Sequence, residues 1–393
     1  MAADRAYLAG GRVGPARAAL AALTARMMAR FEAAGAQRVD PAALHQADVL
    51  LDVYGEDLRG RAFIVEQPGA GPLFLRPDFT LPVLQLHRAA RAEPARYCYL
   101  GPVWRRQPGA QNGRPTEFLQ AGVEVYGEDA AEADAEVFAL MRDALAEGGV
   151  TAPEVVTGDL GVAIAVLEAV AMAPARRAAL RRHFWRPVRF QALLRRYAGP
   201  APAPSPLRRA LLEAASAGGV PALAEGAGGV VGARDLADVA ARAQALAEDA
   251  AAAPVAAEDA RLIDAALAVE GPADAAHARL AELAKAGGVD IAPALERFAR
   301  RLDALARRGV EAGALPFRAA TARTLEYYDG FVFEMAAPGR PDLPPLAAGG
   351  RYDGIAAALG GPPAPAVGAM VRPEALLAAG GLADASAPEA AAC

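Results

Sequence analysis

Asp78 and Thr80 are the first residues of this chain whose types and spacing suit ligand chemistry. They follow Pro77, and in an extended segment two residues at this spacing lie on the same side. A carboxylate and a hydroxyl arranged in this way can hold an ammonium group. The alternative interpretation is that Asp78 only caps a helix that begins near Thr80.

A second candidate is the segment of residues 118–126. Its period-two alternation predicts a strand whose polar face carries Gln120, Gly122 and Glu124. The apolar face carries Leu119, Ala121, Val123 and Val125. Because Gly122 has no side chain, a small ligand could lie against the backbone there, between an amide and a carboxylate. A solvent-facing strand would show the same alternation, although it would more often carry Thr, Lys or Arg than a central glycine.

Two further segments combine tyrosines with glycines and charged residues. Residues 323–330 contain Arg323, Tyr327 and Tyr328, and residues 349–354 contain Tyr352. Paired tyrosines near a strand are often packing residues, so the tyrosines alone do not establish a binding site.

The Asp329-Gly330 pair lies between the paired tyrosines and an apolar run that begins at Phe331. Asp-Gly accepts the positive φ angles of a type I′ turn. The pair therefore predicts a two-residue hairpin turn.

The composition limits what these segments can do. The chain has 393 residues, of which 54% are hydrophobic and 22% charged, which predicts a globular protein of two or three domains. Its formal net charge is −5, whereas a protein that grips a polyanion usually carries a basic excess. We therefore expect no nucleic-acid partner.

The metal-binding residue types are few and scattered. Cys98 and Cys393 are the only cysteines, which excludes a disulfide framework and a thiolate zinc site and fits a reducing cytoplasm. The histidines are His45, His87, His183 and His277. Since no two of them stand at i and i+4, we expect no bound metal and no cofactor.

No segment predicts export or membrane insertion. Asp4, Arg5 and Arg12 precede any apolar run, so we expect no secretory signal. The longest apolar stretch, residues 160–175, contains Glu168 and is shorter than the ~18 residues that a spanning helix needs. We expect a buried helix there, no membrane partner, and a cytoplasmic protein.

The elements that must position the candidate residues follow from hydrophobic spacing. Residues 16–34 place apolar side chains on one helical face, and Gly35 ends that helix. Strand-like runs follow at residues 73–75, 97–104 and 118–126, and strand signals return at residues 325–335. The pattern predicts an α+β fold with one discontinuous domain, residues 1–150 and 315–393, interrupted by a helical insertion, residues 151–314.

Eight arginines lie between residues 176 and 196 inside the expected insertion. They could form an RNA-binding or partner surface. A solvated helix face is favoured, because the interleaved aromatic residues stand at helical spacing and the chain is acidic overall.

Taken together and in this order, the four segments resemble histidyl-tRNA synthetase over about residues 15–130 and 315–380. Residues 97–105 (YCYLGPVWR) and the strand after them are similar to motif 2 of class II synthetases, and residues 323–330 are similar to the family's histidine-recognition motif. The resemblance implies an antiparallel sheet flanked by helices, dimerisation through the region after the first helix, and free L-histidine as the ligand.

The resemblance also implies roles for individual residues. Asp78 and Thr80 would hold the α-ammonium group, Gln120 and Arg323 the carboxylate, and Glu124 with Tyr328 the imidazole. Tyr327 and Tyr352 would line the pocket, and Arg105 would be the vestigial motif 2 arginine. Glu124 suits its role, because a carboxylate that accepts from a ring N–H selects histidine over apolar competitors.

The chain departs from the synthetase at the positions that contact ATP. Ala375 stands where the motif 3 arginine is expected, and Gln107 and Pro108 stand where motif 2 has an acidic residue and a second arginine. Few residues follow Leu376, so we also expect no anticodon-binding domain.

A chain that keeps the histidine pocket but loses ATP and tRNA recognition resembles the regulatory subunits of ATP phosphoribosyltransferase. The resemblance implies a non-catalytic protein, required by a short catalytic subunit in the first step of histidine biosynthesis and for feedback inhibition by histidine. It would self-associate, as a dimer, within a hetero-oligomer. The alternatives are a divergent histidyl-tRNA synthetase or another ATP-dependent histidine-activating enzyme, and an RNA-sensing module.

Overall fold

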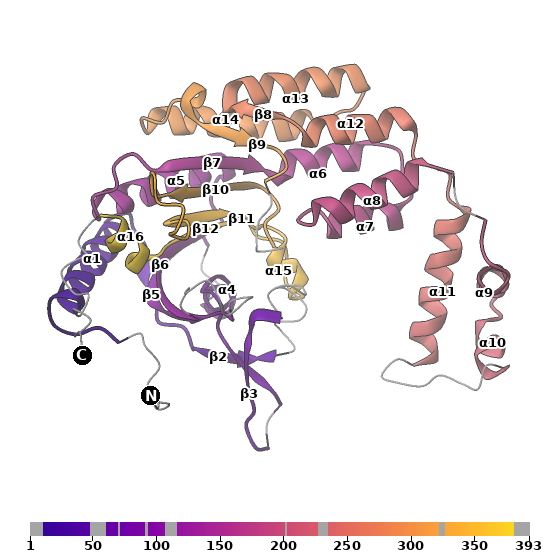
Figure 1. Cartoon of the computed structure of the whole chain (residues 1–393), viewed down its shortest axis with the longest axis horizontal. Coiled ribbons are helices and arrows are strands. Elements are labelled where there is room, and N and C mark those ends of the chain that lie inside the picture. The colour runs from indigo at the N-terminus through magenta and orange to yellow at the C-terminus, as the bar shows by residue number, and fades with distance from the viewer. Residues whose placement is uncertain are drawn as a thin grey trace, which may run out of the picture. The chain divides into compact units, whose positions relative to one another are not determined.

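The computed structural model describes residues 11–47, 60–69, 71–90, 93–106, 116–200, 203–226, 235–321 and 327–380 (Figure 1). They form two compact units. The core unit comprises the described residues up to 162, together with residues 269–279 and those from 292 onward. The helical unit comprises residues 163–268 and 280–291 within the described ranges.

The predicted first helix is confirmed as α1 (Gly14–Ala33). Its buried face consists of Leu20, Leu23, Thr24, Met27, Met28 and Phe31. Gly35 follows with φ 84°, a left-handed conformation that glycine adopts without a steric penalty. The helix packs on strands β5 (Ala95–Trp104) and β6 (Glu117–Tyr126) of the main sheet and on helix α16 (Pro373–Ala379).

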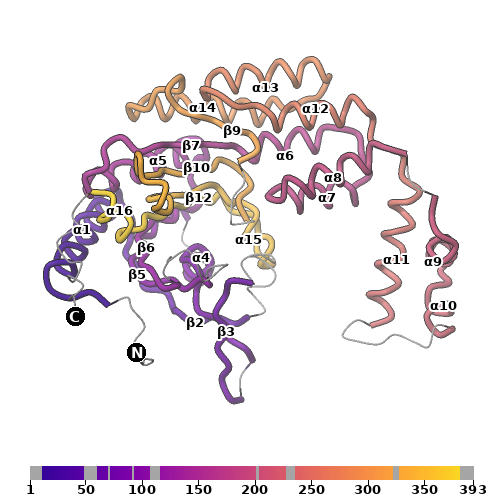
Figure 2. The backbone as a smooth tube through the Cα atoms, in the orientation of Figure 1, coloured from indigo at the N-terminus to yellow at the C-terminus, as the bar shows by residue number. Residues whose placement is uncertain are grey.

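The core unit is built on a sheet with the strand order β1-β5-β6-β12-β11-β10-β7-β9-β8. The strands are β1 (Gln37–Arg38), β5 (Ala95–Trp104), β6 (Glu117–Tyr126), β7 (Glu154–Asp159), β8 (Glu270–Pro272), β9 (Pro316–Arg318), β10 (Phe331–Ala336), β11 (Ala347–Arg351) and β12 (Ala366–Val371). From β5 through to β7 every pairing is antiparallel, whereas β1–β5 and β7–β9 are parallel. Figure 2 shows β6, from the first third of the chain, beside β12, from its last part. A smaller sheet has the order β2-β4-β3, with β2 (Leu44–Gln46), β3 (Phe63–Val65) and β4 (Leu73–Leu75).

Helices cover both faces of the main sheet. On one face α5 (Ala130–Ala146) packs against β10, β11 and β12, and α14 (Ala292–Arg307) packs on α5. On the other face the apolar side chains of α4 (Thr80–Ala90) and α15 (Ile355–Ala358) join one buried cluster with side chains of β5 and β6. The short helix α16 (Pro373–Ala379) follows β12. The expected antiparallel sheet flanked by helices is confirmed, with parallel pairings towards its edges.

The helical unit contains most of the α-helical residues expected in the insertion. Its helices are α6 (Leu160–Ala169), whose first residues belong to the core unit, α7 (Pro174–Arg182), α8 (Pro187–Ala198), α9 (Pro206–Ser216), α10 (Val220–Gly226), α11 (Leu236–Ala251) and α12 (Ala257–Leu267). Helix α13 (Ala273–Gly287) begins in the core unit and continues in the helical unit. Of the clustered arginines, Arg176 is buried and binds Asp249 at 2.7 Å, so it fastens α7 to α11.

The limits of the insertion differ from the expected residues 151–314. Strand β7 lies inside the main sheet, between β10 and β9, and α14 packs on the core helix α5. A three-residue 3-10 helix, η1 (Ala312–Ala314), leads into β9. The sequence did not separate these elements from the insertion. Helix α14 is amphipathic like the insertion helices, and β8 (Glu270–Pro272) lacks the β-branched residues that are typical of strands.

The predicted hairpin turn at Asp329-Gly330 is wrong. Tyr327 and Tyr328 form no strand, and β10 pairs with β11 and β7 instead. The Asp329 carboxylate accepts backbone N–H groups from residues 353 and 354, which turns the chain towards a different segment. Within the described residues, no helix combines the length and the apolar character that crossing a membrane requires.

Candidate ligand site

A cavity lies on the face of the main sheet opposite α5, in the core unit. The space between its lining atoms is about 570 Å³ when the part that is open solvent is included. The lining residues are Asp78, Thr80, Tyr99, Arg105, Gln120, Glu124, Tyr327, Tyr328, Phe333, Glu334, Ala348, Gly349, Gly368, Ala369, Met370 and Arg372. Seven of the residues that the sequence singled out for ligand chemistry are among them: Asp78, Thr80, Arg105, Gln120, Glu124, Tyr327 and Tyr328.

Glu124 is the centre of the hydrogen-bond network at this cavity. Its side chain is 1% exposed, and Oε1 accepts from Thr80 Oγ1 at 3.0 Å and from the Tyr99 hydroxyl at 3.4 Å. The hydroxyl of Tyr352 donates to Oε2 and lies 3.3 Å from the hydroxyl of Tyr126. The eighth predicted residue, Tyr352, thus contacts the site through Glu124 although it is not part of the lining.

The strand register explains how a buried carboxylate fits there. Glu124 on β6 stands opposite Gly368 on β12, and Gly368 pairs in turn with Gly350 on β11. Gly368 leaves free the space that the Glu124 carboxylate occupies, whereas a Cβ on Gly350 would meet Phe331, Val332 and Tyr328.

Asp78 and Thr80 meet at the start of α4. The Thr80 backbone N–H donates to Asp78 Oδ1 at 3.2 Å, so Asp78 caps the start of this helix. The other carboxylate oxygen, Oδ2, lies 3.5 Å from the hydroxyl of Tyr327, which lies 3.2 Å from Thr80 Oγ1. Capping does not exclude ligand binding, because Asp78 also lines the cavity.

Burial raises the pKa of Glu124 to about 8, and the hydrogen bonds from Tyr352 and Thr80 oppose this shift. The negative charge of Asp78 raises the Glu124 pKa further. Burial also raises the pKa values of Tyr99 and Tyr352 well above their ordinary value, so both remain hydroxyl donors. A ligand that brings an N–H donor or a positive charge would stabilise the Glu124 carboxylate.

Gln120 has a buried amide without a hydrogen-bond partner among the described residues. Its side chain is 1% exposed and lines the cavity, and among the described residues neither Oε1 nor Nε2 has a hydrogen-bond partner. Buried amides are nearly always paired, because leaving one unpaired costs about 1–3 kcal/mol. The amide is therefore available to a ligand.

The gap expected beside Gly122 is filled, which corrects the sequence interpretation. A Cβ on Gly122 would lie 2.4 Å from the Tyr99 hydroxyl and 2.4 Å from the carbonyl oxygen of Ala369. The glycine makes room for Tyr99 rather than for a ligand. Tyr99 could have been found from the sequence, since it alternates with Tyr97 along a strand that pairs with β6.

Tyr99 on β5 is held by a stack with two side chains from the segment between β4 and α4. Its ring lies parallel to that of Phe79, with centroids 4.2 Å apart, and the guanidinium of Arg76 lies 4.0 Å from the Phe79 centroid. Arg76 also donates to the carbonyl of Pro41 at 2.6 Å and to that of Pro102 at 3.0 Å. The stack fixes the Asp78–Thr80 segment relative to β5.

Two guanidinium groups border another part of the cavity. Those of Arg105 and Arg372 lie 5.8 and 6.0 Å from the centre of the Phe118 ring, and Arg105 Nε donates to the carbonyl of Pro77 at 2.6 Å. At motif 3 the sequence has Arg372-Pro373 in place of the expected Gly-Leu, and that comparison did not predict that Arg372 lines the cavity. Ala375 itself is buried in α16 and does not line the cavity.

The candidate site residue Arg323 and the motif 2 positions Gln107 and Pro108 lie outside the described residues. Of the part of the chain that the structure describes, no group of three or more His, Cys, Asp or Glu side chains is arranged to hold a metal ion.

Comparisons with known proteins identify the family of this chain. The family model described as histidyl-tRNA synthetase matches residues 12–253 and 239–376. An ATP phosphoribosyltransferase regulatory subunit from Rhizobium rhizogenes is 35% identical over 348 residues, which cover 85% of this chain and 91% of that protein. The protein of the same name from Mesorhizobium japonicum is 36% identical over 364 residues, covering 89% and 95% of the two chains.

Solved structures share the fold. A protein described as an ATP phosphoribosyltransferase regulatory subunit/histidyl-tRNA synthetase, from Bacillus halodurans, superposes with a TM-score of 0.67 at 22% identity, over 96% of this chain and 83% of that one. A histidine–tRNA ligase subunit from Alicyclobacillus acidocaldarius gives a TM-score of 0.60 at 24% identity, over 97% and 98%. The chain belongs to the family of ATP phosphoribosyltransferase regulatory subunits, which have the fold of histidyl-tRNA synthetase.

Proposed function

We propose that this chain is a non-catalytic regulatory subunit that binds free L-histidine in the cavity around Glu124. The observation that carries the proposal is that one cavity is lined both by the buried Glu124 carboxylate and by the Gln120 amide, which has no hydrogen-bond partner among the described residues. A polar ligand that carries N–H groups could donate to both of these side chains.

Histidine has a suitable group for each part of the lining. Its imidazole N–H would donate to Glu124, with Tyr328 beside the ring, and its α-ammonium group would bind Asp78 and Thr80. Gln120 and Arg323 would bind the carboxylate, as the resemblance to histidyl-tRNA synthetase implies. A buried acceptor of this kind rejects apolar amino acids, because it would be left unpaired with them.

The absence of catalysis is supported by the residue that replaces the motif 3 arginine. Ala375 carries no charge and is buried in α16, away from the cavity lining. Arg105 uses its Nε on the carbonyl of Pro77 and would be a structural remnant of motif 2. We infer that the chain forms no histidyl-adenylate and needs no cofactor or metal.

The regulatory role would be exerted through a partner. Relatives that match most of this chain are named regulatory subunits of ATP phosphoribosyltransferase. We infer that this chain is required by a short catalytic subunit in the first step of histidine biosynthesis and gives the complex feedback inhibition by histidine. In this proposal the complex is cytoplasmic, contains dimers of this chain, and involves neither nucleic acid nor membrane.

The test combines ligand binding and assembly. Calorimetry with L-histidine should show one site per chain in the wild type, greatly weakened in Glu124→Ala and unchanged in Glu258→Ala, a matched change at an exposed position of α12. A short catalytic ATP phosphoribosyltransferase subunit should co-purify with the chain and gain activity from it. Absence of both histidine binding and activation would refute the proposal.

A further inference from the structure

We propose that Asp329 is a positioning residue of the cavity, which sets where the Tyr352 hydroxyl meets Glu124 by holding the turn that follows Tyr352. The inference rests on the proposed function only for the identity of the ligand. It assigns a role to the Asp-Gly pair, which the hairpin interpretation left unexplained.

Asp329 connects two segments that are distant in sequence. Its Oδ1 accepts from the backbone N–H of Asp353 at 3.0 Å and its Oδ2 from that of Gly354 at 2.7 Å. Its own backbone N–H donates to the carbonyl oxygen of Arg351 at 3.0 Å. Three hydrogen bonds from one residue therefore enclose Tyr352, which lies between Arg351 and Asp353.

Each of the two segments contributes a tyrosine to the hydrogen-bond network around the Glu124 carboxylate. The Tyr327 hydroxyl lies 3.2 Å from Thr80 Oγ1, which donates to Glu124 Oε1 at 3.0 Å. The Tyr352 hydroxyl donates to the other carboxylate oxygen, Glu124 Oε2. The rings of Tyr327 and Tyr352 meet edge to face, with centroids 5.8 Å apart. Asp329 connects the two segments, since it follows Tyr328 directly and its carboxylate accepts from the backbone of the turn after Tyr352.

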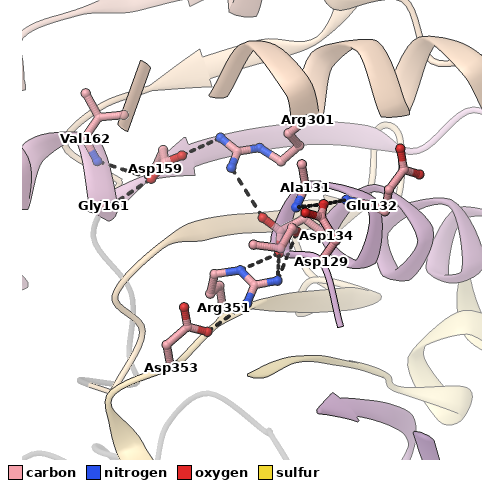
Figure 3. A network of polar contacts seen from close by, with 11 residues as sticks. Asp129, Ala131, Glu132, Asp134, Asp159, Gly161, Val162, Arg301, Arg351 and Asp353 are labelled. Carbon is pink, nitrogen blue, oxygen red and sulfur yellow. Dashed lines mark hydrogen bonds and ion pairs between the residues drawn. The ribbon is translucent and has the colours of Figure 1, made fainter. Parts of the chain in front are cut away.

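The position of the turn is fixed from the other side by a buried ion network, shown in Figure 3. Arg351 donates to Asp134 on α5 at 2.9 Å and to Asp353 at 2.7 Å. Arg301 of α14 binds the other oxygen of Asp134 at 3.3 Å and also binds Asp159. Arg351 is thus anchored to the helical layer, and the backbone N–H groups of the turn after it depend on Asp329.

Space at the turn supports this dependence. A Cβ on Gly354 would lie 2.9 Å from Asp329 Oδ2, so the glycine allows the carboxylate to approach the backbone closely. A carboxylate that accepts two backbone N–H groups can also serve stability alone. The two roles differ in one respect, because a positioning residue must act through the Tyr352 hydroxyl.

The experiment uses the full chain with Asp329→Asn, Tyr352→Phe, the double variant, and Asp342→Asn as the control. Asp342 is an exposed residue that pairs with Arg340 outside the cavity, at 2.8 Å. Asp329→Asn keeps one acceptor oxygen, so Asp329→Ala, which keeps none, is the second variant and should shift both readouts further in the same direction.

The ligand-free arm measures unfolding free energy by urea denaturation from about pH 5 to about pH 9. The Tyr352 hydrogen bond holds down the raised pKa of Glu124, so Tyr352→Phe should extend the pH-dependent loss of stability to higher pH. Asp329→Asn should shift the profile in the same direction, whereas Asp342→Asn should match the wild type. A profile of Asp329→Asn that matches the wild type would overturn the inference.

The ligand arm measures L-histidine affinity in the same variants. Asp329→Asn should weaken binding about tenfold in the wild-type background but less than about threefold in the Tyr352→Phe background, because both changes remove the same contact. Equal losses in the two backgrounds would overturn the inference. If the wild type bound no histidine, the proposed function would fail, and the ligand-free arm would still decide the role of Asp329.

Discussion

The carboxylate of Glu124 occupies the space that a side chain at Gly368 would need. The two residues face each other on β6 and β12, and a Cβ built on Gly368 would lie 1.6 Å from Glu124 Oε2. No real Cβ approaches an oxygen so closely, so the glycine is required for the carboxylate to lie where three hydroxyl groups surround it.

Gly368→Ala should therefore displace Glu124 and weaken L-histidine binding by at least about tenfold, an effect of about 1.4 kcal/mol or more. Calorimetry checks this, with Gly71→Ala as the control, because a Cβ at Gly71 would have no neighbour within 4 Å. Wild-type affinity in Gly368→Ala would show that the Glu124 position is not needed for binding.

The raised pKa of Glu124 has a consequence for stability. The folded state holds this proton more tightly than the unfolded chain, so its contribution to stability is complete below about pH 4.5 and is lost as the pH rises towards 8. Glu124→Gln has no such proton to lose. The variant should gain stability relative to the ligand-free wild type across this window, by a few kcal/mol in order of magnitude.

Urea unfolding at several pH values measures that difference, with the exposed change Glu258→Gln as the control that should follow the wild type. A constant difference between Glu124→Gln and the wild type from pH 5 to about pH 8 would contradict the assigned pKa.

Removing an arginine from the buried ion network should destabilise the fold far more than removing the neighbouring, half-exposed arginine of α14. Arg301→Ala leaves Asp134 and Asp159 buried without this cation and should reduce the unfolding free energy by about 3–5 kcal/mol. Arg300→Ala removes a half-exposed pair with Asp129 and should cost less than about 1 kcal/mol. Denaturant unfolding of the two adjacent variants checks this contrast, and similar losses would refute it.

The proposal that the chain is not an enzyme predicts no histidine-dependent exchange of pyrophosphate into ATP. The physical reason is the missing motif 3 guanidinium at Ala375, which leaves the nucleotide without that clamp. Exchange at rates comparable with a histidyl-tRNA synthetase would contradict it, and such a synthetase assayed in parallel provides the positive control.

Local spacing predicted much of the site. Alternation along residues 118–126 placed Gln120 and Glu124 on one face, and both line the cavity. The same alternation wrongly predicted a space for a ligand beside Gly122. It describes a single strand and cannot show that Tyr99 of the neighbouring strand fills that space.

Contacts between distant segments were beyond sequence reasoning. Arg301, Asp134 and Arg351 come from three elements that meet only in the folded chain, and none has a distinctive spacing. Strand β7 was assigned to the insertion because helical composition surrounds it on the C-terminal side. Its place beside β10 depends on pairing with residues about 170 positions later.

The central claim is that histidine acts through Glu124. The most direct measurement is inhibition of the assembled complex with a catalytic subunit by L-histidine, for wild type and Glu124→Ala, with binding followed by calorimetry. Loss of the buried acceptor should shift the inhibition curve to higher histidine by roughly one to two decades, while complex formation and activation persist. If Glu124→Ala bound histidine and was inhibited like the wild type, the regulatory histidine would have to bind elsewhere.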